Sequence, residues 1–221
     1  MKKTFIAIDG LDASGKKTQT DLLIEFLTKK GADFRHLSFP TYDINYSSLV
    51  NLYLSGSFGE NPEDVNAYAA SSFFAMDRYS SYMLDWKKDY DEGKIIIANR
   101  YTTANAVHQL SKLPESEYET FLEWLYDYEF VKLGLPKPDV VLYLSLPPEL
   151  SMRLIEKRCE ETSVVKDIHE KNISHIEKSY KAVLFSSKKL GWHRIDVNKG
   201  NEFRPVNEIH NEIINYLKDV L

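Results

Sequence analysis

Short apolar segments alternate with longer amphipathic ones along the whole chain. The short segments are continuously apolar, as in Ile95-Ile-Ile-Ala98 and Val140-Val-Leu-Tyr-Leu144. That pattern is typical of parallel strands buried on both faces of a sheet. We predict strands over Thr4–Asp9, Phe34–Phe39, Ile95–Asn99, Val140–Leu146 and Trp192–Val197.

The segments between these strands have helical periodicity. In the last of them Val206, Ile209 and Ile213 share one face, and Pro205 suits a first helical turn. Predicted helices cover Lys16–Lys30, Leu49–Leu54, Val65–Tyr90, Ser116–Lys132, Pro148–Lys157, Glu170–Lys189 and Pro205–Val220. Strands separated by helices indicate a three-layer α/β/α fold, in which a five-stranded parallel sheet has helices on both faces. No repeat or long linker divides the sequence, so we expect residues 1–221 to form one domain.

A glycine-containing loop lies between the first predicted strand and the first predicted helix. Gly10 and Gly15 permit a backbone path that aims N–H groups at phosphate oxygens, and the helix N-terminus adds partial positive charge. Lys16 can reach the outer phosphates, which makes this a P-loop of the NTPase type. The predicted ATP-binding residues are Gly10, Leu11, Asp12, Ala13, Ser14, Gly15, Lys16, Lys17 and Thr18.

The loop departs from the usual pattern at one position. Lys17 stands where a Ser or Thr hydroxyl normally holds Mg²⁺, and Thr18 lies about 100° further round the helix. We therefore expect a modified metal site. One hypothesis is that the charge of Lys17 partly lowers the need for tightly held metal.

The carboxyl ends of the predicted strands bring further polar groups to one edge of the sheet, where open α/β sheets bind ligands. Arg100 follows the third strand in Asn99-Arg100-Tyr101, and it either clamps a phosphate or pairs structurally with a carboxylate. Phe74 and Arg78 are i and i+4 on a helix, an arrangement that suits a flat base with carbonyl groups, although phenylalanine at this spacing is more often core.

A polar segment between two predicted helices contains Lys157, Arg158 and Lys166. These cations favour a short lid over about residues 157–168 that closes on a polyphosphate. A solvated surface loop explains the same composition equally well.

The overall composition is that of a globular protein, with 43% hydrophobic and 28% charged residues. The net charge of −5 and the lack of a basic stripe argue against nucleic acid as a partner. A single cysteine, Cys159, excludes an intrachain disulfide and a cysteine metal cluster. The first apolar run is too short for a signal peptide or a membrane span, so we expect a cytoplasmic protein without a membrane partner.

From about Lys3 to its C-terminus, the chain resembles the thymidylate kinases, nucleoside monophosphate kinases that phosphorylate dTMP. The resemblance rests on the order and spacing of several motifs. They are the Gly10–Thr18 loop with Asp12, Phe39-Pro40, Tyr53-Leu54, Phe74 with Asp77-Arg78, Asn99-Arg100-Tyr101 with Asn105 and Gln109, Pro138-Asp139, and Asp167-x-x-Glu170.

The resemblance implies a catalytic set and a substrate set. The catalytic residues would be Lys16, Arg100, Asp12 and the lid residue Arg158, with Mg²⁺ bound to ATP and anchored by Asp12 and Glu170 through water. Phe74 would stack on thymine, Arg78 would reach its carbonyl edge, and Arg100 would hold the dTMP phosphate. The full substrate set is Asp12, Phe39, Pro40, Tyr42, Phe74, Arg78, Arg100, Asn105 and His108. The family is commonly homodimeric.

Four positions differ from the family pattern: Asn99, Lys17, Tyr42 and His108. Asn99 replaces an aspartate, Tyr42 an arginine that binds phosphate, and His108 a larger aromatic residue that favours deoxyribose. The sequence therefore predicts transfer of the γ-phosphoryl group of ATP to dTMP and leaves two alternatives open. One is a kinase of another nucleoside or nucleoside monophosphate, and the other is a nucleotide-binding regulatory protein that has lost catalysis.

Overall fold

Among the described residues, five parallel strands form the central sheet. The structure is a computed structural model that describes residues 3–42, 45–162 and 173–221, and only the backbone at 45 and 157–162. The strands are β1 Phe5–Gly10, β2 Phe34–Ser38, β3 Ile95–Asn99, β4 Val140–Ser145 and β5 His193–Asp196. Their order is β2-β3-β1-β4-β5, so the predicted five-stranded parallel sheet is confirmed.

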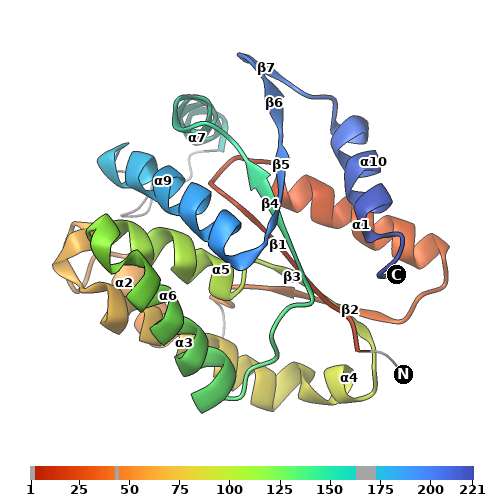
Figure 1. Cartoon of the computed structure of the whole chain (residues 1–221), viewed down its shortest axis with the longest axis horizontal. Coiled ribbons are helices and arrows are strands. Elements are labelled where there is room, and N and C mark those ends of the chain that lie inside the picture. The colour runs from red at the N-terminus through yellow and green to blue at the C-terminus, as the bar shows by residue number, and fades with distance from the viewer. Residues whose placement is uncertain (1–2, 43–44, 163–172) are drawn as a thin grey trace.

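Helices cover both faces of this sheet (Figure 1). One face lies against α1 (Lys16–Lys29) and α10 (Val206–Leu217), and the other against α3 (Ala67–Ser81) and α9 (Ile173–Leu190). Alternate residues of β1 enter opposite cores: Ile6 and Ile8 pack with α1 and α10, whereas Phe5 and Ala7 pack on the other side. A strand buried on both faces needs apolar residues throughout, which explains its continuous apolar run.

The remaining elements complete the described part of the fold. The other helices are α2 Ser48–Leu54, α4 Lys87–Asp91, α5 Thr102–Ala104, α6 Tyr118–Tyr126 and α7 Pro148–Thr162. π-helical segments cover Tyr82–Trp86, Asn105–Gln109 and Asp127–Lys132, and 3₁₀ turns cover Asn45–Ser47, Pro62–Asp64, Leu110–Lys112 and Glu115–Glu117. A small antiparallel ribbon joins β6 Asn198–Lys199 to β7 Glu202–Phe203. Every helix in the described ranges is too short or too polar to span a membrane.

The structure corrects three of the predicted helices. The helix predicted over Ser116–Lys132 is α-helical over Tyr118–Tyr126 and π-helical over Asp127–Lys132. The single helix predicted over Val65–Tyr90 is interrupted by the π-helical segment Tyr82–Trp86, where Tyr82 and Trp86 both enter the core. The helix predicted over Pro148–Lys157 continues to Thr162, into the first part of the predicted lid. The helical stretch Thr102–Lys112 was not predicted, since its Thr, Asn, His and Val residues have weak helix propensity.

Candidate active site

The loop between β1 and α1 is shaped to bring its backbone close to a ligand. A Cβ atom at Gly10 would overlap the Ser14 hydroxyl and the Leu144 carbonyl oxygen, so only glycine fits there. Gly15 caps α1 with φ of 86°, and this glycine has no side chain that could cap the helix N-terminus. The first N–H groups of α1 are therefore available to an anion.

Lys16 folds back over the same loop. Its Nζ donates hydrogen bonds to the carbonyl oxygens of Gly10 (2.8 Å) and Leu11 (2.9 Å), and it lies 3.8 Å from Asp12 Oδ1. Phosphate oxygens placed on the loop would be within reach of the same ammonium group. Lys17 points the other way, because its side chain is 85% exposed and pairs with Asp21 at 2.6 Å. The structure thus gives no support to the hypothesis that Lys17 supplies charge at the loop.

Two carboxylates hold Arg100 beside the loop. Arg100 directly follows β3 with φ of 62°, and its Nη2 pairs with Asp12 Oδ1 while its Nε lies 4.0 Å from Asp9 Oδ1. Asp9 is buried and accepts hydrogen bonds from Gly10 N (2.8 Å) and Thr103 Oγ1 (2.5 Å). A left-handed backbone conformation in a non-glycine residue is costly and is typical of functional sites. Here it aims a guanidinium group at the place where the loop would hold phosphate.

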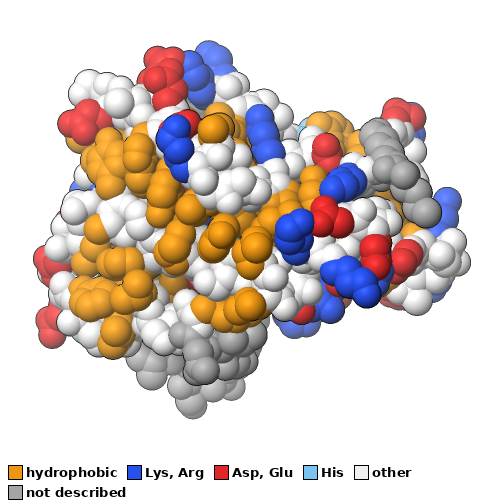
Figure 2. Space-filling view, turned by 90° about the horizontal axis from the view of Figure 1, so that it is seen from below, with side chains coloured by type: hydrophobic (Ala, Val, Ile, Leu, Met, Phe, Trp, Pro, Cys, Tyr) orange, Lys and Arg blue, Asp and Glu red, His pale blue; other side chains and the backbone are white. Residues whose placement is uncertain are grey.

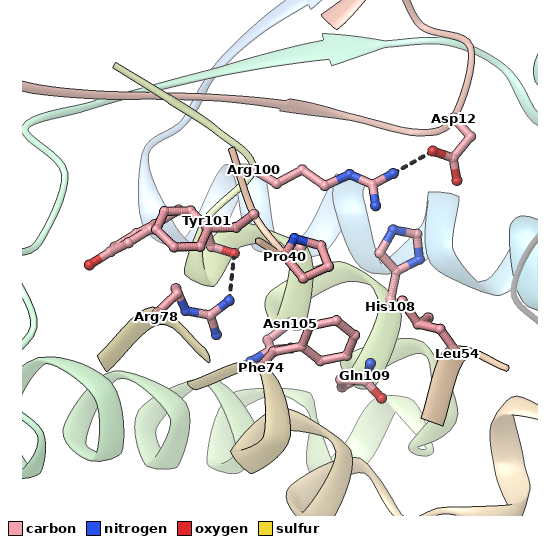
Figure 3. A pocket seen from close by; sticks show the side chains of 12 residues that line it. Asp12, Pro40, Leu54, Phe74, Arg78, Arg100, Tyr101, Asn105, His108 and Gln109 are labelled. Atoms are coloured by element: carbon pink, nitrogen blue, oxygen red, sulfur yellow. Dashed lines mark hydrogen bonds and ion pairs between the residues drawn. The ribbon is translucent and has the colours of Figure 1, made fainter. Parts of the chain in front are cut away.

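A pocket runs from Asp12 toward the helices below the sheet (Figure 3). The hollow takes in about 460 Å³ of space, which includes open solvent at its mouth. Its lining comes from the loop after β1, from the residues that follow β2 and β3, and from helical residues of α2, α3 and the stretch 102–109. The lining residues are Asp12, Phe39, Pro40, Leu54, Phe74, Arg78, Arg100, Tyr101, Ala104, Asn105, His108 and Gln109.

The far end of the pocket combines an aromatic ring with buried polar groups. Phe74 meets Tyr53 edge-on, with ring centroids 6.0 Å apart. Arg78 is 1% exposed and donates to Glu129 through Nε (2.8 Å) and Nη2 (2.6 Å). Gln109 is also 1% exposed, and its Oε1 has no hydrogen-bond partner among the described residues. A buried acceptor without a partner among the described residues, in the same pocket lining as a guanidinium donor, suits a ligand that presents both a donor and an acceptor.

Comparison with known proteins assigns this arrangement to a family. The model of the family described as thymidylate kinase matches residues 8–213. The chain belongs to the thymidylate kinase family. Thymidylate kinases are nucleoside monophosphate kinases, and the matched span includes the loop, the pocket and most of α10.

Individual thymidylate kinases are distant relatives that align over much of this chain. The thymidylate kinase of Plasmodium falciparum is 26% identical over 96% of this chain and 89% of its own length. A probable thymidylate kinase of Thermococcus onnurineus is 30% identical over 95% of each chain. A solved structure of the thymidylate kinase from Candida albicans has a TM-score of 0.71 at 21% identity, covering 99% of this chain and 92% of that one, and supports the fold alone.

The structure brings together all but one of the residues predicted to contact the substrate of a thymidylate kinase. Asp12, Phe39, Pro40, Phe74, Arg78, Arg100, Asn105 and His108 all line the pocket. Tyr42 does not line it and is 51% exposed. Just before it, the Thr41 hydroxyl and backbone N–H donate to Asp77 at 2.7 and 3.3 Å, and the chain leaves the pocket at that point.

Two predicted residues cannot be compared with this geometry. The Arg158 side chain and the whole of Glu170 lie outside the described residues, as do residues 163–168 of the predicted lid and the side chains of 157–162. Asn99, which replaces the family's aspartate, does not line the pocket.

His108 is held in the pocket wall by a second histidine. Its ring stacks on that of His175 with centroids 5.8 Å apart and an interplanar angle of 21°. Burial, helped by the nearby Arg100 charge, lowers the pKa of His108 well below its usual value, and burial lowers that of His175 to about 4. Both rings are therefore neutral at pH 7, and His108 faces a ligand as a neutral hydrogen-bonding group.

Three residues that shape this site were not among the site residues predicted from the sequence. Asp9 had a detectable signal, because a carboxylate at a strand end next to a phosphate loop lies at the ligand edge of the sheet. Gln109 belongs to a helical stretch that was not predicted, although it was part of the motif order. Glu129 lies in an acidic amphipathic helix, where nothing in the sequence separates it from its exposed neighbours.

A second hollow lies on the other side of the loop. Its walls come from the loop, α1, the end of β5 and the segment that enters α10. The lining residues are Ala13, Ser14, Gly15, Thr18, Gln19, Val197, Phe203, Arg204, Val206 and Ile209. The loop thus separates two spaces, one lined by Asp12 and Arg100 and the other by Ser14 and Thr18.

The oxygen donors around the loop fit magnesium bound chiefly through a nucleotide. No cluster of three or more His, Cys, Asp or Glu side chains that could hold a metal exists among the described residues. Asp12 is partly exposed beside the loop, whereas both oxygens of Asp9 already accept hydrogen bonds. Mg²⁺ commonly keeps several waters and takes one or two carboxylates plus substrate phosphates, and Asp12 meets that requirement.

Proposed function

We propose that this protein transfers the γ-phosphoryl group of ATP to dTMP, giving dTDP and ADP. The observation that carries the proposal is that one pocket contains both kinds of group needed for the acceptor. Asp12 and Arg100 lie at its loop end, and Phe74, Arg78 and Gln109 lie at its far end. A nucleoside monophosphate would point its phosphate at the loop and its base away from it.

The base end fits thymine. Phe74 would stack on the ring, and Arg78 would donate to the O4 carbonyl oxygen. Gln109 Oε1, which is buried in the pocket wall and has no partner among the described residues, would accept the N3–H group. This hydrogen bond would give the buried Gln109 Oε1 a partner. Because a buried acceptor without a partner costs free energy, the bond would increase the affinity for the base.

The phosphate end fits in-line transfer. A dTMP phosphate oxygen would attack the γ-phosphorus of ATP held on the loop, and no general base is needed because a phosphate monoester is ionised near neutral pH. Lys16 and Arg100 would neutralise the charge of the transferred group, with Arg158 a further cation on α7. Mg²⁺ bound with ATP supplies additional charge neutralisation, and Asp12 is the residue that would anchor it, directly or through water.

The hollow beyond Thr18 would take the nucleoside of ATP. Val197, Val206 and Ile209 give it an apolar wall, and Phe203 from the β6–β7 ribbon stands at its rim with 48% of its surface exposed. A partly exposed aromatic ring beside an apolar wall suits a purine, which gains from stacking.

The test is ADP formation from ATP and Mg²⁺ with a panel of acceptors: dTMP, dUMP, UMP, dCMP, AMP, GMP and thymidine. The proposal predicts a strong preference for dTMP. Preference for another acceptor would support a kinase of different specificity. ATP binding with no turnover of any acceptor would support a regulatory nucleotide-binding protein.

We also propose that the chain forms a homodimer through an apolar face. Figure 2 shows the lower face of the molecule as it stands in Figure 1. Apolar side chains spread over one half of that face, on the side of α2, α3 and α6, and charged groups gather on the other half. Large exposed apolar side chains on neighbouring segments include Leu84 (76% exposed), Val131 (68%) and Met83 (48%). Exposed patches of this kind commonly mark interfaces. Light scattering should give a dimer for the wild type and a folded monomer for Leu84→Glu.

A further inference from the structure

One buried carboxylate, Glu129, accepts hydrogen bonds from two residues that line the far end of the pocket, Arg78 and Asn105. Glu129 is fully buried in the π-helical segment Asp127–Lys132 and does not itself line the pocket. It accepts hydrogen bonds from Arg78 Nε (2.8 Å) and Nη2 (2.6 Å), Thr102 Oγ1 (2.6 Å) and Asn105 Nδ2 (3.1 Å). Since Arg78 and Asn105 both line the pocket, Glu129 acts on the ligand site through them.

The first effect is on Arg78. Its pairing with Glu129 is bidentate, which fixes the plane of the guanidinium group. A third, longer bond runs from Nη1 to the Tyr101 carbonyl oxygen at 3.4 Å (Figure 3). The three bonds recorded among the described residues use three of five N–H groups. The remaining donors are held in one orientation at the base end of the pocket.

The second effect is on the amide of Asn105. Its Nδ2 donates to Glu129 Oε1 and to the Ser71 carbonyl oxygen, both at 3.1 Å. Both neighbours are pure acceptors, so the amide cannot turn over without facing oxygen with oxygen. Asn105 therefore has only its Oδ1, an acceptor, left for the pocket. Without Glu129, only the Ser71 carbonyl would hold that orientation.

We infer that Glu129 is a positioning residue that sets the hydrogen-bonding polarity of the pocket, and so selects bases with a carbonyl group beside a ring N–H. The inference rests on the proposed function. Thymine and uracil match the fixed order of an Arg78 donor beside the acceptors of Asn105 and Gln109. Cytosine has an amino group beside an unprotonated ring nitrogen, so it would meet donor with donor and acceptor with acceptor.

The test is the isosteric substitution Glu129→Gln, assayed with dTMP and dCMP. A glutamine amide brings an N–H₂ group to a place where the Arg78 guanidinium and the Asn105 Nδ2 group can only donate, so Arg78 or Asn105 must shift. We expect kcat/KM for dTMP to fall mainly through KM. The ratio of kcat/KM for dTMP to that for dCMP should fall about tenfold or more, because fixed polar groups are what reject the wrong base. A merely structural defect would lower both substrates alike and preserve the ratio.

Thr102→Val is the matched control. It removes one donor to Glu129 but leaves the bonds of Arg78 and Asn105 to Glu129 in place, so the ratio should stay at the wild-type value. If Glu129→Gln does not fold by circular dichroism, Asn105→Leu replaces it. That variant keeps the Arg78–Glu129 pair and deletes the amide whose orientation is fixed, and the ratio should fall again.

The outcomes separate the two proposals. A wild-type enzyme that does not phosphorylate dTMP refutes the proposed function. A wild-type enzyme that prefers dTMP, together with an unchanged ratio in folded Glu129→Gln or in Asn105→Leu, refutes the role of Glu129 and leaves the function standing.

Discussion

Lys112 gives a prediction whose size follows from its surroundings. It ends the 3₁₀ turn Leu110–Lys112, and its Nζ donates to Tyr53 Oη (2.8 Å) and the Val65 carbonyl oxygen (3.0 Å). Burial lowers the pKa of Lys112 from 10.5 to about 7, and the nearby Glu63 carboxylate offsets this only in part. The amine thus holds Tyr53, whose ring packs on Phe74. The buried site at the same time disfavours the protonated form of Lys112.

The pKa shift makes folding stability depend on pH. Between pH 7 and 10.5 the unfolded chain binds a proton at Lys112 that the folded protein has largely released, so stability rises with pH across this window. Below about pH 7 this group adds no further dependence, and its full cost is about 5 kcal/mol. From pH 7 to pH 9 its contribution to the free energy of unfolding rises by about 2 kcal/mol.

Urea denaturation of the wild type and of Lys112→Met at pH 7 and pH 9 tests this. Methionine keeps an unbranched side chain that is one atom shorter and does not titrate, so the variant should lack the gain of about 2 kcal/mol between the two pH values. The comparison uses the change with pH, so any constant effect of the substitution cancels. Equal changes in the wild type and the variant would refute the reasoning.

Three further predictions concern the site. Arg100→Met removes the proposed phosphate clamp and its ion pair with Asp12, so kcat/KM for the monophosphate acceptor should fall by about 10² or more in steady-state assays. Phe74→Leu keeps an apolar side chain but loses stacking, so the Kd for dTMP by calorimetry should rise about tenfold with little change for ATP. Lys17→Met alters an exposed ion pair, so the Mg²⁺ dependence of the rate should not change.

The sheet was predictable because its strands are buried on both faces. Such strands read as continuous apolar runs, and Ile95–Asn99 was predicted with the bounds that the structure gives. Helices were harder where side-chain packing overrides periodicity. The break at Tyr82–Trp86 depends on two aromatic side chains entering one core, which the sequence pattern between Val65 and Tyr90 does not reveal.

The candidate site also has a part that the sequence predicts and a part that it does not. The loop and Arg100 follow strands, and strand ends define the ligand edge of a parallel sheet, so their meeting could be predicted. Glu129 reaches Arg78 across 51 residues of sequence, and no local pattern reports such a contact. The place of Lys17 in the loop motif predicts a role at the phosphates, whereas the structure shows its side chain exposed and paired with Asp21, a position that the motif alone does not reveal.

The most direct test of the central claim is to follow the transferred group itself. ATP labelled with ¹⁸O in its γ-phosphoryl group is incubated with Mg²⁺, dTMP and the protein, and the products are identified by mass spectrometry. The account predicts dTDP that contains the labelled phosphoryl group, together with unlabelled ADP. Labelled inorganic phosphate with unchanged dTMP would contradict it, because the pocket beside the loop would then not hold the acceptor.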